Sequence, residues 1–326
     1  METAPEKGAK PCQAGLEFGS QAGQNGVRFP NISFKKVEKL WFKIVMADDA
    51  WESGRMTGHW AGWLRQGAAV GGEERAMREQ DLIEQWKGEE QQPFRGWDFS
   101  YLKGRYFEAS PPWSYEERVR KLLGEVEAVL DMGTGGGEKL LEFKDLLPAH
   151  TVATEGWPPN LPVARENLEP HGIEVVPYDV EKEARMPFAD GSFGLVTNRH
   201  EAFDACEVAR ILKPGGVFLT QQVDGRSMAD LASVFGREAP NPQVTLAACG
   251  KEVEQAGLVI QFAEEAMGKM RFRDVGALVY YAQAAPWEFP EDFSVERYAA
   301  ELLGLHKSGR LSFDMGHFII QARKPA

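Results

Sequence analysis

The sequence has little of what marks secreted, membrane-spanning and metal-binding proteins. Its three cysteines, Cys12, Cys206 and Cys249, lie far apart without CxxC or other metal-ligand spacing, which fits a reducing compartment and predicts no metal site. No apolar run approaches 18 residues, so we expect no membrane span. The N-terminus also lacks the charged-then-apolar layout of a signal peptide. These absences together predict a cytoplasmic protein.

Positive charge is scarce as well. The chain has 37 Lys and Arg residues against 49 Asp and Glu, a net charge of -12. Because a basic face supplies most of the affinity of proteins that bind phosphate backbones, this balance argues against a nucleic-acid partner, although it does not exclude a local basic groove. A length of 326 residues with 26% charged and 11% aromatic residues suits one large folded α/β domain with appendages, or two small domains.

The stretch from Val126 to Phe143 organises the chain. Val129 and Leu130 lead into Asp131 as a short buried strand, and four glycines within positions 133–137 then force a tight turn. A helix-compatible run follows from Glu138. Strand, glycine turn and helix present backbone N–H groups and a helix N-terminus to a ligand. Glycine is needed there because a Cβ would block positive φ angles and the close approach of the ligand.

The glycine spacing discriminates between ligands. A dinucleotide fingerprint needs glycine at its sixth position, where this chain has Glu138, and the Gly-Lys-Ser/Thr of a Walker A loop is absent. The stretch 129–137 instead resembles motif I of class I S-adenosylmethionine (SAM) methyltransferases, two hydrophobic residues followed by Asp-x-Gly-x-Gly-x-Gly, with every position filled. SAM carries no phosphate, and a carboxylate can complement its ammonium and sulfonium charges. On this motif alone, a glycine-rich turn of another α/β protein remains the alternative.

Three further segments resemble the same family in the same order. They are the strand 150–155 that ends in Glu155, the run 186–196 that leads into a fourth strand, and the loop and strand 212–220. The resemblance covers roughly residues 114–225 and is nearest to the type 11 group, which includes ubiquinone and menaquinone C-methyltransferases. It implies an α/β fold with a Rossmann-like, mostly parallel sheet of seven strands, flanked by helices, with the last strand antiparallel at the second-last place.

The resemblance also implies the cofactor, SAM, and the residues that bind it. Glu155 is placed like the family acid that binds the two ribose hydroxyls, because a carboxylate accepts two O–H bonds at once. Asp179 is placed like the acid that accepts from the adenine amino group, and Val180 like the residue whose N–H meets the ring. The full set of expected cofactor-binding residues is Asp131, Gly133, Thr134, Gly135, Gly137, Glu155, Asp179, Val180 and Asn198.

The fourth strand ends at residues 197–201, where the family places the methyl group. His200 is a candidate base near neutral pH, Arg199 could hold an acidic substrate bidentately, and Glu201 could orient the histidine. In the alternative interpretation, Arg199 and Glu201 form a structural ion pair and His200 lines the pocket. The Asn/Asp-Pro-Pro-Tyr/Phe motif of amino-group methyltransferases is absent, which disfavours methylation of exocyclic base nitrogens.

The remaining segments suggest a domain organisation. We expect a disordered extension over residues 1–45, an N-terminal helical layer and lid over 46–113, and a methyltransferase domain over 114–326. Ser114-x-x-Glu117 is a capping box that opens a helix through Leu123. An insertion around 270–310 is expected to contact substrate.

The C-terminal third resembles the family only in outline. Its pattern predicts a helix over 242–256, a strand over 258–262, a helix over 293–303 and a last strand over 316–322.

Three functions compete at this point. The leading hypothesis is a SAM-dependent methyltransferase that acts on a small molecule and has no membrane span. The second is an RNA base methyltransferase of the same fold, against which the acidic charge weighs. The third is a non-catalytic SAM-binding protein, which needs an intact cofactor site and no acceptor pocket.

Removal of residues 1–45 should leave the protein folded and able to bind SAM. This segment lacks any core pattern, and a segment that buries little apolar area cannot offset the entropy of ordering it, roughly 1–2 kcal/mol per residue. A chain that begins at Met46 is expected to keep its melting temperature within a few degrees and to retain its SAM affinity in calorimetry. A large loss in either would show that the residues before Met46 are part of the fold.

Overall fold

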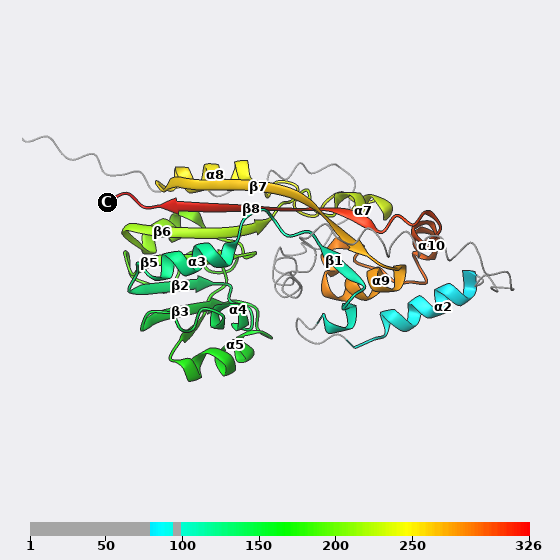
Figure 1. The fold of residues 1–326 in the computed structure, drawn as a ribbon, viewed down its shortest axis with the longest axis horizontal. Helices are drawn as coiled ribbons and strands as arrows, with labels where there is room; N and C mark the ends of the chain where they lie inside the picture. Colours follow the sequence, from blue (N-terminus) through cyan, green and yellow to red (C-terminus); the bar gives the residue numbers. More distant parts are fainter. Residues whose placement is uncertain (1–78, 94–98) are drawn as a thin grey trace, which may run out of the picture.

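A computed structural model of the chain describes residues 79–93 and 99–326, and an eight-stranded sheet organises them (Figure 1). The expected extension over 1–45 lies outside the described residues, as does much of the expected helical layer over 46–113. The strands are β1 (Tyr106–Glu108), β2 (Ala128–Met132), β3 (His150–Glu155), β4 (Glu174–Pro177), β5 (Phe193–Arg199), β6 (Leu212–Val223), β7 (Val259–Phe272) and β8 (Ser312–Arg323).

The helices of the described residues connect and cover these strands. The α-helices are α2 (Glu79–Glu90), α3 (Tyr115–Leu123), α4 (Glu138–Leu141), α5 (Leu161–Leu168), α6 (Ala205–Ile211), α7 (Ala229–Val234), α8 (Leu246–Gln255), α9 (Val275–Ala284) and α10 (Ala299–Ser308). Three short 3-10 turns are η4 (Ser100–Leu102), η5 (Glu169–His171) and η6 (Pro286–Glu288). Within the described part of the chain, no helix has the length and apolar character needed to cross a bilayer.

The sheet has the strand order β1-β7-β8-β6-β5-β2-β3-β4. Strands β2 to β6 run parallel to one another, whereas β8 is antiparallel to both neighbours, β6 and β7. The predicted Rossmann-like sheet of seven strands is therefore confirmed and corresponds to β2 to β8. Its last strand, β8, is antiparallel and lies second from the edge of these seven strands. The difference is an eighth strand, β1, which pairs antiparallel with β7 and forms the edge.

Two long strands join the molecule's two lobes. The sheet lobe holds β2 to β6 with α3 to α6 and α8, and the helical lobe holds α2, α7, α9 and α10 (Figure 1). Strands β7 and β8 pair from Val259–Arg323 to Arg271–Ser312, but β6 pairs only with the stretch of β8 from His317 to Arg323. The rest of the β7–β8 ladder extends into the helical lobe, as Figure 1 shows.

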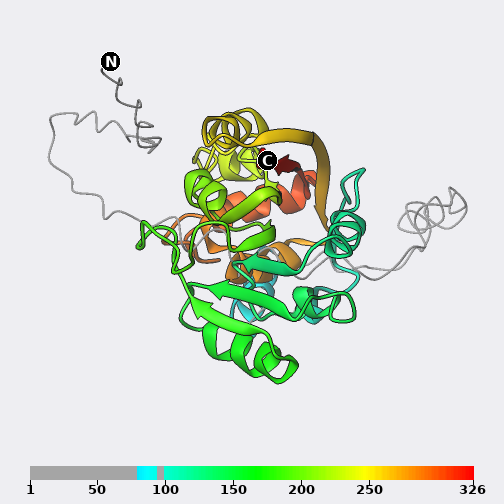
Figure 2. The same ribbon diagram turned by 90° about the vertical axis from the view of Figure 1, so that its left-hand side faces the viewer.

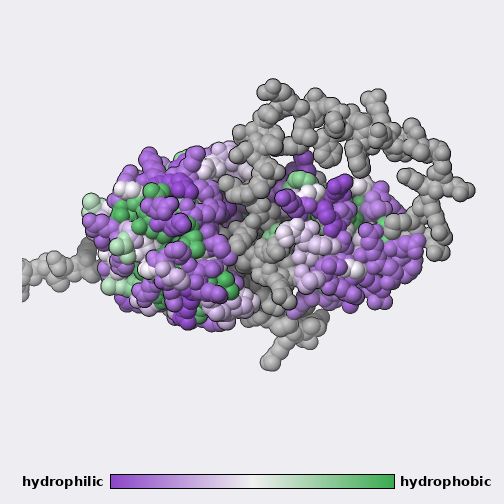
Figure 3. Space-filling view, turned by 60° about the horizontal axis from the view of Figure 1, so that its bottom comes forward, coloured by the Kyte–Doolittle hydropathy of each residue, from purple (hydrophilic) through white to green (hydrophobic). Residues whose placement is uncertain are grey.

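Separate hydrophobic cores fill the two lobes. In the sheet lobe, residues of α6 and α8 pack on one face of the sheet and residues of α3 on the other, and Figure 2 shows helices on both sides of it. Burial on both faces explains why β2 and β3 appear in the sequence as continuous apolar runs. In the helical lobe, α9 is buried along nearly its whole length against Trp86, Phe272 and Phe313. The face shown in Figure 3 is mostly hydrophilic, with hydrophobic residues scattered over the sheet lobe.

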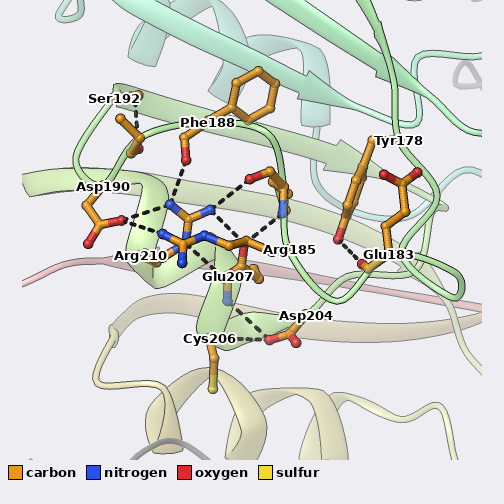
Figure 4. Close-up of polar contacts among 12 residues, drawn as sticks. Tyr178, Glu183, Arg185, Phe188, Asp190, Ser192, Asp204, Cys206, Glu207 and Arg210 are labelled. Atoms are coloured by element: carbon orange, nitrogen blue, oxygen red, sulfur yellow. Dashed lines mark hydrogen bonds and ion pairs between the residues drawn. The ribbon is translucent and has the colours of Figure 1, made fainter.

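Local polar contacts fix the starts of two helices in the sheet lobe. Ser114 caps α3 by accepting a hydrogen bond from the Glu117 amide at 3.1 Å, as the capping box predicts. Asp204 caps α6 by accepting from the amides of Cys206 and Glu207 (Figure 4).

A half-buried arginine anchors the loop that leads into β5. The Arg210 guanidinium pairs with Glu207 at 2.7 Å and with Asp190 at 2.9 Å. It also donates to the Phe188 carbonyl at 2.7 Å (Figure 4). These contacts tie α6 to the loop, and so hold the start of β5, the strand that ends just before His200.

A three-residue ion network ties β1 and α2 to α9. Arg105, just before β1, donates to Glu89 of α2 at 2.8 Å and to Asp274, the N-cap of α9, at 2.6 Å. The Glu89 side chain is 11% exposed. Because a buried carboxylate without its partner is costly, this network holds the edge strand in place.

Arg105→Met should lower the free energy of unfolding by about 1–3 kcal/mol, because it leaves the Glu89 carboxylate buried and unpaired. Denaturant unfolding followed by circular dichroism measures the change. Lys103→Met, at an exposed position two residues earlier, is the matched control and should have little effect. Equal losses in the two variants would contradict the role assigned to the network.

Candidate active site

The glycine turn after β2 has the backbone conformation that the sequence predicts. Gly133, Gly135 and Gly137 have φ angles of 63°, 65° and 83°, a region that only glycine adopts readily. Gly137 is the N-cap of α4, and a Cβ on it would lie 2.5 Å from the Leu168 side chain. The Thr134 amide donates to the Thr154 carbonyl at 2.8 Å, which fastens the turn to the end of β3.

Glu155, the last residue of β3, lies directly against this turn. It is 1% exposed. One carboxylate oxygen accepts from the Gly135 amide at 2.8 Å and the other from the Trp157 amide at 2.5 Å. Two backbone N–H donors hold the carboxylate in one orientation.

The loop after β4 completes the same edge of the sheet. A Cβ on Gly156 would lie 2.4 Å from the Tyr178 carbonyl, so the loops after β3 and β4 are in close contact. Asp179 follows in this loop, where it accepts from the Glu181 amide at 3.2 Å and pairs with Lys182 at 3.4 Å. Val180 is half-buried and packs against the core of the sheet lobe. The structure thus brings Glu155, Asp179 and Val180 to one edge.

Asp131 and Asn198 lie deeper, between strands. Asp131 accepts from the Thr197 hydroxyl at 2.8 Å, and burial raises the pKa of its carboxyl to about 6 although hydrogen bonds from Thr197 and Thr134 oppose the shift. Asn198 accepts from the Thr220 hydroxyl at 2.8 Å and from the Gln222 amide at 2.7 Å. These two predicted cofactor residues thus also join neighbouring strands at the carboxyl edge.

The three predicted acceptor-site residues separate from one another at the end of β5. Arg199 lies toward α3, 3.8 Å from Glu116 and over the Tyr115 ring. Glu201 lies against the glycine turn, because a Cβ on Gly133 would be 2.4 Å from its Cγ. His200 lies between these directions, in a left-handed conformation with φ of 59°.

His200 is held by β6. Its amide donates to the Gln221 carbonyl at 2.8 Å, and its ring Nε2 is 3.3 Å from the Gln221 side-chain nitrogen. Burial lowers the pKa of the ring well below its ordinary value, and the charge of Arg199 lowers it further. The imidazole is therefore neutral at pH 7, where it accepts a hydrogen bond well but takes a proton weakly.

Two buried residues beside His200 were not predicted as site residues from the sequence. The His317 ring of β8 stacks on the His200 ring with 5.5 Å between centroids, and its Nε2 is 3.4 Å from the Glu108 carboxyl of β1. Burial raises the pKa of Glu108 to about 7 and lowers that of His317 to about 4. Both shifts favour the uncharged forms of the two side chains. No local pattern signals this cluster, since β1 and β8 are about 200 residues apart.

A pocket opens next to His200, between the end of β6 and η6. His200 and Gln222 line it from the sheet, Asp224 and Ser227 from the turn after β6, and Trp287 and Glu288 from η6. Trp287 and Glu288 belong to the insertion that the sequence places around 270–310. Of the three acceptor-site candidates, His200 is the one that lines this pocket.

Residues 130–220 match the family model of the methyltransferase domain. A comparison with curated proteins finds no match.

Solved structures with a similar fold share little sequence with the chain. A protein from Bacillus halodurans C-125 is 22% identical, with 64% of this chain and 97% of that chain covered and a TM-score of 0.47. The YcgJ protein of Bacillus subtilis is 19% identical, with 65% and 100% covered and a TM-score of 0.46. An S-adenosylmethionine-dependent methyltransferase from Mesorhizobium loti is 16% identical, with 65% and 98% covered and a TM-score of 0.40.

Removal of the Arg199 charge should raise the pKa of His200, because that charge disfavours the imidazolium. NMR titration of the histidine side chains measures this. In the unaltered chain, His200 should stay neutral at pH 6, whereas in Arg199→Gln its midpoint should move upward. Arg120→Gln, on the exposed side of α3, is the control and should leave it unchanged. A His200 midpoint near 6.5 in the unaltered chain would contradict the burial described above.

Proposed function

We propose that this chain transfers a methyl group from SAM to a small-molecule acceptor, because residues 130–220 match the family model of the methyltransferase domain. The observation that carries the proposal is the convergence of the glycine turn, Glu155 and the Asp179 loop on the carboxyl edge of one parallel sheet. Ligands of open α/β sheets bind at such an edge.

The residues at this edge fit SAM. Gly133, Gly135 and Gly137 let a ligand approach the backbone where a Cβ would obstruct it. Glu155 would receive the two ribose hydroxyls, because its carboxylate is already held by two amides. Asp179 and Val180 would bind the adenine, and Asp131, Thr134 and Asn198 would support the turn and the methionine part. When bound, SAM supplies an electrophilic methyl group on a positively charged sulfur.

The pocket beside His200 supports a small acceptor. Residues of the helical lobe close it from one side, which suits a compact molecule better than a nucleic-acid strand. The net charge of -12 and the absence of lysine and arginine from the described residues that line the pocket also disfavour RNA. A non-catalytic SAM-binding protein would need no pocket at the methyl-transfer end of the sheet.

We assign to His200 the role of contacting the acceptor molecule. Methyl transfer from a sulfonium depends chiefly on positioning, and a base is needed only for an acceptor that carries a proton at attack. A neutral imidazole at the pocket wall can accept a hydrogen bond from such an acceptor and orient it. Arg199 and Glu201 would act more remotely, Arg199 through its effect on His200 and Glu201 through the glycine turn.

SAM binding should depend on Gly133. Calorimetry is expected to show SAM affinity in the micromolar range, and Gly133→Arg should abolish it, because the side chain would enter the space beside Glu201. Gly172→Arg is the matched control. Gly172 also has a positive φ of 75°, but a Cβ there has no atom within 4 Å, and the residue precedes β4 at the opposite edge. Preference for NAD over SAM would contradict the assignment.

The acceptor class is decided by offering two kinds of substrate. The protein is incubated with methyl-labelled SAM and either a small-metabolite extract or total RNA, and incorporation is counted. We expect label in the metabolite fraction, lost in Gly133→Arg. Label in RNA alone would favour the RNA methyltransferase, and no label in either, with SAM bound, would favour a non-catalytic binding protein.

A further inference from the structure

Glu288 of η6 is a buried carboxyl group that is only half satisfied. It is 4% exposed. One oxygen, Oε1, accepts from the Trp287 indole N–H at 3.0 Å. The other, Oε2, is buried and has no hydrogen-bond partner among the residues that the structure describes. Because Glu288 lines the pocket beside His200, the unsatisfied oxygen belongs to the wall of a binding site.

The surroundings do not compensate a charge on this carboxyl. Burial raises its pKa to about 8, against the weaker opposing effects of the Trp287 hydrogen bond and of Arg237. Arg237 donates instead to the main-chain carbonyls of Trp287 and Phe289. A buried carboxyl in this state either keeps a proton or gains a cation from a ligand.

The other described residues that line the pocket carry no positive charge of their own. Asp224 is fully buried and is paired with Arg226, at 2.7 Å, outside the lining. His200 is neutral because of its burial. No lysine or arginine occurs among the described residues that line the pocket. An anionic acceptor would therefore meet only acidic or neutral groups, whereas a cation would be attracted.

We propose that this pocket recognises its acceptor through an amino group, which enters as an ammonium ion beside Trp287 and donates a hydrogen bond to Glu288 Oε2. This proposal rests on the function proposed above and names the class of its acceptor. An ammonium ion supplies both the missing donor and the missing positive charge, and the Trp287 indole gives its carbon skeleton an apolar neighbour. When Glu288 is protonated, its proton leaves to solvent as the ammonium ion binds.

Matched amine and alcohol probes test the proposal. Phenethylamine and 2-phenylethanol, with ethylamine and ethanol as smaller versions, are titrated into the full chain in calorimetry, above and below pH 8 and without SAM. We expect an amine to bind roughly 10–100-fold more tightly than its alcohol, the effect of one hydrogen bond to a charged group. Below pH 8, amine binding should weaken and should release protons to the buffer.

Variants assign the preference to Glu288. Glu288→Gln should remove the preference for the amine and retain SAM affinity. Glu291→Gln changes an exposed acid in the next turn of the chain and should alter neither property.

Three results would overturn the proposal: equal binding of amine and alcohol, no binding of either amine in the millimolar range, or an unchanged preference in Glu288→Gln. If Glu288→Gln fails to fold, the amine–alcohol comparison and the proton release in the unaltered chain still decide. Failure of the unaltered chain to bind SAM would instead count against the proposed function.

Discussion

The antiparallel pairing of β7 with β8 is the constraint on which the rest of the structure depends. One end of this ladder completes the parallel sheet through β6, and the other end carries α9, η6 and the edge strand β1. A single set of backbone hydrogen bonds therefore fixes how the helical lobe lies relative to the sheet's carboxyl edge. The pocket between the end of β6 and η6, and the stacking of His317 on His200, follow from that placement.

Burial sets the charge of the groups at this edge, and the donors available to each decide its role. Glu155 is buried with two backbone amides on its carboxylate, which suits an ion that accepts further hydroxyl donors. Glu288 is buried with a hydrogen-bond donor on one oxygen only, and in our proposal a cationic ligand supplies the second donor. His200, His317 and Glu108 lie together, and burial favours the uncharged form of each. In the proposed function, the backbone thus preorganises the side that binds SAM, and the ligand completes the side that binds the acceptor.

Local signals predicted the parallel part of the fold well and the long-range part poorly. The strand 150–155 and the helix that ends at Leu123 appear as predicted, because an apolar run marks the strand and a capping box marks the start of the helix. The strand expected over 258–262 extends instead to Phe272. Its second half was not predicted because most of its residues are exposed or half-buried and give no apolar run in the sequence. Likewise the helix expected over 293–303 runs from Ala299 to Ser308. Glu108 and His317 could not be found from sequence, because only pairing between distant strands brings them to His200.

Hydrogen–deuterium exchange in the presence of SAM tests the central claim most directly, namely that the carboxyl edge formed by the glycine turn and the loops after β3 and β4 is the cofactor site. The account predicts slower exchange of amides within residues 133–137 and 178–181 when SAM is added. The outer β7–β8 ladder, residues 268–272 with 312–315, should exchange at an unchanged rate, because it holds the lobes and contacts no cofactor. Protection confined to the helical lobe, or no protection at the glycine turn under saturating SAM, would contradict it.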